Sequence, residues 1–180
     1  MVQAWYQGGI SVFDWTDAAH PREIAYHDRG PLDPTRMSMA GSWSVYWYNG
    51  VIVSSEIARG LDIFELTPSA LLSQNEIDAA KTVHYDYLNP QGQPKMVGPP
   101  SFPLARAYVD QLERSKGLST TRLAAVRQTL TSAEGAAGAQ RSGALTGLAA
   151  QLDGDARASS DGAKVQKLAG AVRELAALNR

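Results

Sequence analysis

The sequence predicts an α+β protein, in which an antiparallel β region of about six strands at residues 1–66 precedes an α-helical bundle at residues 104–180. Ten of the 14 aromatic residues lie in the first 66 positions, where glycines separate short runs of alternating apolar and polar side chains. Such runs are typical of strands. After Tyr108 the chain has no aromatic residue, and alanine with periodic leucine and valine predicts helices.

Three strands are expected in the first half of the β region, at residues 2–7, 9–15 and 22–27. Each alternates apolar and polar residues, as a strand with one buried face must. Gly9 begins the second strand, because glycine allows a tight turn to adopt a positive φ. A turn ending at Pro21 separates the second strand from the third.

Three more strands are expected at residues 44–48, 51–54 and 60–65. Asn49 and Gly50 stand between the first two, and this pair is a strong hairpin signal because a type I′ turn requires positive φ at both central residues. A boundary is expected at Thr67 and Pro68, because proline ends a strand ladder and is tolerated in the first turn of a helix.

An internal repeat relates residues 9–14 to residues 60–65 at a constant offset of 51 residues. Each block begins with glycine, alternates apolar and polar residues and ends with an acid. A period of about 40 to 50 residues built from three or four strands is typical of a β-propeller blade. A propeller usually closes with at least about four blades, so we expect an incomplete propeller-like sheet with open strand edges.

Residues 67–103 are expected to form a helix and then a proline-rich linker. Ser73 and Glu76 have the spacing of a capping box, and five prolines between residues 85 and 103 indicate a semi-rigid strap.

Four amphipathic helices are expected beyond the linker. Spacings of three and four residues place each apolar set on one helix face, so that the four helices can share a core. The sets are Leu104, Tyr108 and Leu112; Leu123, Val126 and Leu130; Leu145, Leu148 and Leu152; and Val165, Leu168, Val172, Leu175 and Ala176. Caps are expected at Ser119 or Thr120 and at Ser160 or Asp161.

Composition excludes several classes of function. The chain has no cysteine, which excludes disulfides, a thiol nucleophile and a cysteine-ligated zinc site. Its net charge of −1 argues against general nucleic-acid binding, because phosphate contacts require an excess of lysine and arginine. No apolar run approaches the roughly 20 residues of a membrane-spanning helix.

The stretch from Gly9 to Ile24 resembles the repeat unit of LVIVD-repeat β-propeller proteins, with Ala18 in place of the usual proline after the turn aspartate. Residues 43–64 are similar to the last blade of bacterial members. The resemblance implies the C-terminal part of an exported, extracellular or cell-surface protein. Because the first residue falls inside a blade of that pattern, we expect the chain to be a fragment of a longer one.

Residues 104–180 resemble the FIMAH domain, a helical module at the ends of secreted bacterial proteins. The resemblance rests on Ala107–Leu112, on Leu130 with Ala133 and Glu134, and on Leu145–Leu152. It implies an appendage without chemistry.

Six residues are candidate binding residues, each with a structural alternative. Asp28 and Asp33 lie in the longest polar loop of the β region and could hold a hard cation through oxygen, although acids of this kind also form turns. An aromatic platform for a sugar or a peptide could be formed by Trp43, Tyr46, Trp47 and Tyr48. Strict alternation sends half of them inward, so that packing alone would account for Tyr46 and Tyr48, or else for Trp47.

Glu56 and Arg59 lie between two strands, where a catalytic carboxylate with an arginine clamp is conceivable but a turn-fixing ion pair is favoured. The three histidines lack the spacing of a zinc site, so no metal site and no cofactor are expected.

The sequence therefore predicts a non-enzymatic binding or scaffolding module. Its expected partners are a protein or a cell-surface ligand, the missing blades, or another copy through open strand edges. Two alternatives remain open. The chain could be the C-terminal part of a propeller hydrolase whose catalytic residues lie in missing blades, or an interaction bundle that carries a degenerate β remnant.

Overall fold

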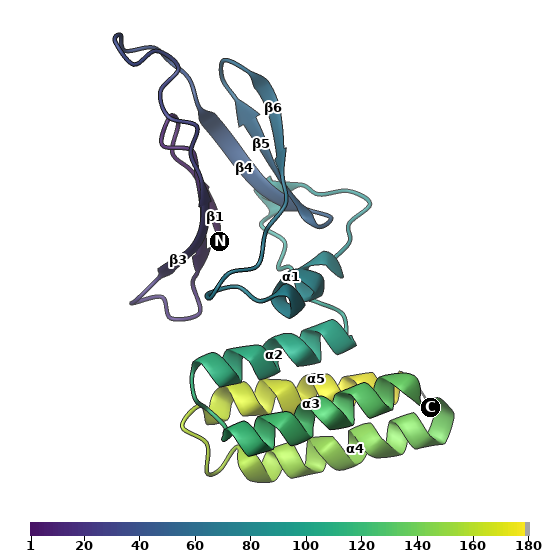
Figure 1. The fold of residues 1–180 in the computed structure, drawn as a ribbon. Helices are drawn as coiled ribbons and strands as arrows, with labels where there is room; N and C mark the ends of the chain where they lie inside the picture. Colours follow the sequence, from purple (N-terminus) through teal and green to yellow (C-terminus); the bar gives the residue numbers. More distant parts are fainter. Residues whose placement is uncertain (179–180) are drawn as a thin grey trace. The chain divides into compact units, whose positions relative to one another are not determined.

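The structure is a computed structural model that describes residues 1–178, and within them it confirms the α+β class (Figure 1). The chain divides into two compact units. The β unit contains Met1–Leu72 and Val83–Met96, and the helical unit contains Ser73–Thr82 and the chain from Val97 onward. The expected linker at residues 67–103 is thus shared between the two units.

Six strands form two antiparallel sheets of three strands each. The first sheet contains β1 (Val2–Ala4), β2 (Ile10–Asp14) and β3 (Arg22–His27), with β2 in the centre. The second contains β4 (Ser42–Tyr48), β5 (Val51–Glu56) and β6 (Gly60–Phe64), with β5 in the centre.

The sequence predicts one open sheet, whereas the structure has two sheets joined through Tyr6 and Ser42. Their backbones exchange two hydrogen bonds, at 3.1 and 2.9 Å. The predicted hairpin turn is confirmed by φ values of 46° at Asn49 and 91° at Gly50.

The two sheets pack face to face within the β unit around Ile10, Val12 and Ile52, which are buried. Seven partly buried apolar side chains surround them: Val2, Ile24, Ala25, Val45, Trp47, Phe64 and Leu66. The ring centroids of His27 in β3 and Phe64 in β6 lie 4.6 Å apart, so that these two side chains also make contact between the two sheets.

The internal repeat is a repeated hairpin with the same strand register. In the first sheet Val2 pairs with Val12 and Ala4 with Ile10. In the second sheet Val53 pairs with Ile63 and Ser55 with Leu61, which are the same positions shifted by 51 residues. The two copies differ beyond the hairpin, because β3 pairs with β2 whereas no described strand pairs with the outer edge of β6.

The helical unit contains α1 (Gln74–Lys81), α2 (Phe102–Arg114), α3 (Thr120–Gly135), α4 (Gly138–Asp155) and α5 (Gly162–Ala177). The capping box of Ser73 and Glu76 at α1 is confirmed. Ser119 caps α3 and Asp161 caps α5, as predicted, and Ser101 caps α2. Helices α2 to α5 run alongside one another and bury one apolar core, which contains the predicted Leu112, Leu130, Leu148 and Leu168 (Figure 1).

Candidate functional site

Glu56, the last residue of β5, is buried and fully engaged by its neighbours. Its Oε1 accepts a hydrogen bond from the backbone N–H of Gly41, and its Oε2 accepts one from the N–H of Ala58 at 3.0 Å. The Arg59 guanidinium lies 3.6 Å from Oε1. The structure thus brings the predicted pair together, and the carboxylate closes the loop between β5 and β6.

A small cavity lies beside Glu56 within the β unit. Its volume is about 20 Å³, which is room for one water molecule. Arg29 and Asp62 form an ion pair of 2.7 Å in its wall, and His27 also lines it. The cavity is too small for an organic substrate. The Arg29–Asp62 pair and the Glu56 carboxylate join neighbouring segments at this end of the two sheets, whereas the buried Nε2 of His27 has no hydrogen-bond partner among the described residues.

Asp28 and Asp33 each fix a local turn in the loop between the two sheets. Asp28 accepts a hydrogen bond from the N–H of Gly30 at 2.7 Å. Asp33 accepts bonds from the N–H of Thr35 at 2.9 Å and from its hydroxyl at 2.8 Å, and these bonds lower the pKa of Asp33. Among residues 1–178, no group of three or more acids or histidines is placed to hold a metal ion.

The two candidate tryptophans point to different surroundings. Trp47 packs against the core of Ile10, Val12 and Ile52. Trp43 is 62% exposed and stacks edge-on against Tyr6, with ring centroids 5.6 Å apart. The register of β4 and β5 shifts between Ser42 and Ser44, which interrupts the alternation and separates Trp43 from the inward set. The two rings therefore do not form one platform.

The face of β4–β6 that points away from the first sheet is apolar and has a groove at one end. Strand pairing places Tyr46, Val53 and Ile63 in one row and Leu61 in the next. Leu61 is 63% exposed and Ile63 is 62% exposed. We call Tyr46, Val53, Leu61 and Ile63 the outer apolar face.

A groove of about 430 Å³ lies at one end of this face, between Tyr46, Tyr48 and Val53 and the segment 86–90. Asn49 holds that segment, because its side chain donates to the carbonyl of Tyr85 at 3.0 Å and accepts from the N–H of Tyr85 at 2.8 Å. The Tyr48 hydroxyl donates to the same carbonyl at 3.1 Å.

Sequence reasoning considered Tyr46 and Tyr48 as aromatic platform residues, but it missed the apolar face that Val53, Leu61 and Ile63 form with Tyr46, and it missed the anchor at Tyr85. Alternation places Leu61 and Ile63 on one side of β6, but it does not show which side the other sheet covers. Tyr85 lies 36 residues from Asn49, and no local pattern links them.

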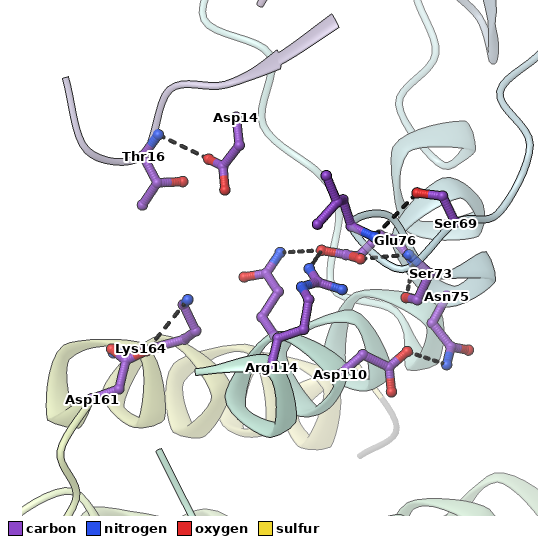
Figure 2. A network of polar contacts seen from close by, with 12 residues as sticks. Asp14, Thr16, Ser69, Ser73, Asn75, Glu76, Asp110, Arg114, Asp161 and Lys164 are labelled. Carbon is purple, nitrogen blue, oxygen red and sulfur yellow. Dashed lines mark hydrogen bonds and ion pairs between the residues drawn. The ribbon is translucent and has the colours of Figure 1, made fainter. Parts of the chain in front are cut away.

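A polar network joins α1 to α2 inside the helical unit (Figure 2). The Glu76 carboxylate accepts hydrogen bonds from Arg114, from Gln111 at 2.9 Å and from the Ser73 N–H at 2.7 Å. Asn75 donates to Asp110 at 2.8 Å.

The network also changes the acidity of its carboxyl groups. Burial, the largest single influence, raises the pKa of Glu76, but the bonds from Arg114, Ser73 and Gln111 together outweigh it and lower the pKa below its usual value. The pKa of Asp110 is lowered in the same way by Asn75 and Arg127 against the effect of burial. The Glu76 carboxylate thus joins α1 to α2, and the Asp110 carboxylate joins α2 to α1 and α3.

Comparison with protein-family models, curated proteins and solved structures finds no match to this chain. None of the helices within residues 1–178 has the length and apolar character needed to cross a membrane.

Proposed function

We propose that this chain is a non-enzymatic binding or scaffolding module of an exported protein, made of LVIVD-like propeller blades followed by a FIMAH-like helical bundle. The observation that carries the proposal is the outer apolar face of β4–β6, where Leu61 and Ile63 are each more than 60% exposed. Contiguous apolar surface of this kind on a soluble protein marks an interaction site.

The state of the candidate catalytic groups also supports a non-enzymatic role. Both carboxylate oxygens of Glu56 accept hydrogen bonds from backbone N–H groups. Asp28 and Asp33 accept hydrogen bonds from the loop that they stabilise. A general base needs an oxygen within reach of a substrate proton, and both oxygens of Glu56 already accept backbone hydrogen bonds, as does Oδ1 of Asp28 and of Asp33. Trp47, which would complete an aromatic platform with Trp43, is partly buried and packs against the core of the β unit.

The hydrolase alternative is tested by a turnover assay on the full chain. The chain is incubated with chromogenic ester, glycoside, phosphate and peptide substrates, alongside a variant with Glu56→Gln and Arg59→Gln and a variant with Asp28→Asn and Asp33→Asn. We expect no turnover above the uncatalysed rate from any of the three proteins. Turnover that disappears in either variant while the circular dichroism spectrum is retained would overturn the non-enzymatic proposal.

A further inference from the structure

Equivalent faces of the two repeated hairpins differ in burial. Val2, Ile10 and Val12 of the first sheet point to the second sheet, and Ile10 is 3% exposed and Val12 9%. The offset of 51 residues maps these three onto Val53, Leu61 and Ile63, which form the outer apolar face. A face that is buried in the first copy is therefore presented to solvent in the second.

The face of the second sheet that packs against the first sheet is buried, whereas the equivalent face of the first sheet lies outside the interface. Ile52 and Phe64 of the second sheet receive the first sheet. The offset maps them onto Met1 and Phe13, which strand alternation places on the side of the first sheet that points away from the second. Met1 is 53% exposed, and Tyr26 on the same side is 76% exposed.

This correspondence describes a head-to-tail stack of the two sheets. If the two sheets were related by a two-fold axis, equivalent residues would be buried on both sides of their interface. Here Val12 is buried in the interface while its equivalent Ile63 lies outside it. Within residues 1–178, the outer apolar face of the second sheet and the Met1, Phe13 and Tyr26 side of the first sheet therefore lie outside this interface. On the latter side Trp5 covers Ser11, to which it donates a hydrogen bond at 3.0 Å.

We propose that the outer apolar face of one copy binds the Met1, Phe13 and Tyr26 side of the first sheet of a second copy. This inference rests on the proposed scaffolding function, because it names the partner of the surface that carries it. The packing between the two sheets within one chain is the template, since the new contact repeats the same pair of faces. Within β4–β6 the outer side holds no charged residue: its members are Ser44, Tyr46, Tyr48, Val51, Val53, Ser55, Leu61 and Ile63. Charged side chains border the two faces, because Asp86 lines the groove beside Tyr46 and Glu23 pairs with Phe13 on the opposing side of the first sheet.

A head-to-tail contact can be repeated from copy to copy. Propellers close with about four to eight blades, so a ring of sheets would need about two to four copies that contribute two sheets each. We expect self-association that increases with concentration and stops at such a closed assembly.

The test measures the mass of the full-length chain by sedimentation velocity over a concentration series. Ile63→Lys changes the outer apolar face, and Tyr26→Lys changes the opposing side of the first sheet. Leu178→Lys is the matched control, because Leu178 is 66% exposed in the helical unit. All three positions are exposed, so each variant is expected to keep its circular dichroism spectrum.

We expect the unmodified chain and Leu178→Lys to reach an average mass of at least about two copies, and Ile63→Lys and Tyr26→Lys to remain monomers. A mixture of Ile63→Lys with Tyr26→Lys should form a one-to-one dimer, because each variant keeps the face that the other has lost. A monomeric unmodified chain overturns the inference, as does a Tyr26→Lys variant that associates normally.

These outcomes are separable from the proposed function. A monomeric chain without turnover overturns the self-association alone and leaves the outer apolar face to a different partner. Turnover overturns the scaffolding proposal whatever the mass of the protein.

Discussion

Glu56 and Gly41 are joined by a hydrogen bond that connects the end of β5 to the loop before β4, with the Glu56 carboxylate accepting from the Gly41 N–H. The side chain of Glu56 is 3% exposed, and its other oxygen accepts from Ala58. A single carboxylate thus satisfies two backbone donors that the strands leave unpaired.

Glu56→Ala is expected to destabilise the β unit by about 2 kcal/mol, because it leaves two N–H groups without their acceptor. Urea unfolding followed by tryptophan fluorescence measures this unit alone, since all four tryptophans lie in it. Glu23→Ala in β3 is the control and should change stability by less than about 0.5 kcal/mol, because Glu23 is exposed. Equal losses in the two variants would contradict the structural role of Glu56.

Gly9 and Gly60 hold the same position in the two copies of the repeat, with φ values of 78° and 95°. A Cβ at Gly9 would lie 1.9 Å from the carbonyl oxygen of His27, whereas a Cβ at Gly60 would meet no atom within 4 Å. Gly60→Ala should therefore cost only the strain of a positive φ, about 1–2 kcal/mol.

Gly9→Ala should lower the free energy of unfolding of the β unit by more, about 3 kcal/mol or above, because strand β3 must also move. The same fluorescence measurement compares the two variants. Equal costs would show that β3 does not lie against Gly9 as described.

Asn49→Gly should release the segment around Tyr85 without breaking the hairpin turn, because glycine adopts the positive φ that the turn requires. The loss of two hydrogen bonds predicts cleavage by trypsin after Lys95 about tenfold faster than in the unmodified chain. Tyr48→Phe removes one bond to the same carbonyl and should have a smaller effect. An unchanged cleavage rate in Asn49→Gly would show that the anchor is not at Asn49.

The stability of the helical unit should fall in acid because of Glu76. The pKa of Glu76 is lower in the folded chain than its usual value, so its contribution is present above the unfolded pKa of about 4.3 and is lost as the pH falls through the folded pKa. Glu76→Gln should destabilise the unit by about 1 kcal/mol at pH 7 and reduce the loss of stability as the pH falls below about 5.

Urea unfolding followed by circular dichroism at 222 nm measures this change. Glu174→Gln in α5 is the control, because Glu174 is exposed. A pH dependence that is as steep in Glu76→Gln as in this control would contradict the assignment.

Much of the local structure could be predicted from the sequence, because its signals are short-range. The φ values at Asn49 and Gly50 follow from steric limits within one turn, and the capping box of Ser73 and Glu76 follows from a spacing of three residues. Strand β3 has the predicted bounds of residues 22–27 for the same reason.

The candidate site could be predicted less well. Glu56 and Arg59 are close in sequence, and their pairing follows from that proximity. Trp43 and Trp47 share a strand, but the shift of register between Ser42 and Ser44 depends on β5 and sends their rings to different surroundings.

The sequence by itself determined the two kinds of secondary structure, the turns and caps, and a hairpin repeated at 51 residues, because dihedral preference and apolar spacing act over a few neighbouring residues. Only the tertiary structure decided that six strands divide into two sheets, that Asn49 holds Tyr85, and that Val12 is buried while its equivalent Ile63 is exposed. Burial depends on which surface arrives from elsewhere in the chain, and identical local patterns cannot specify it.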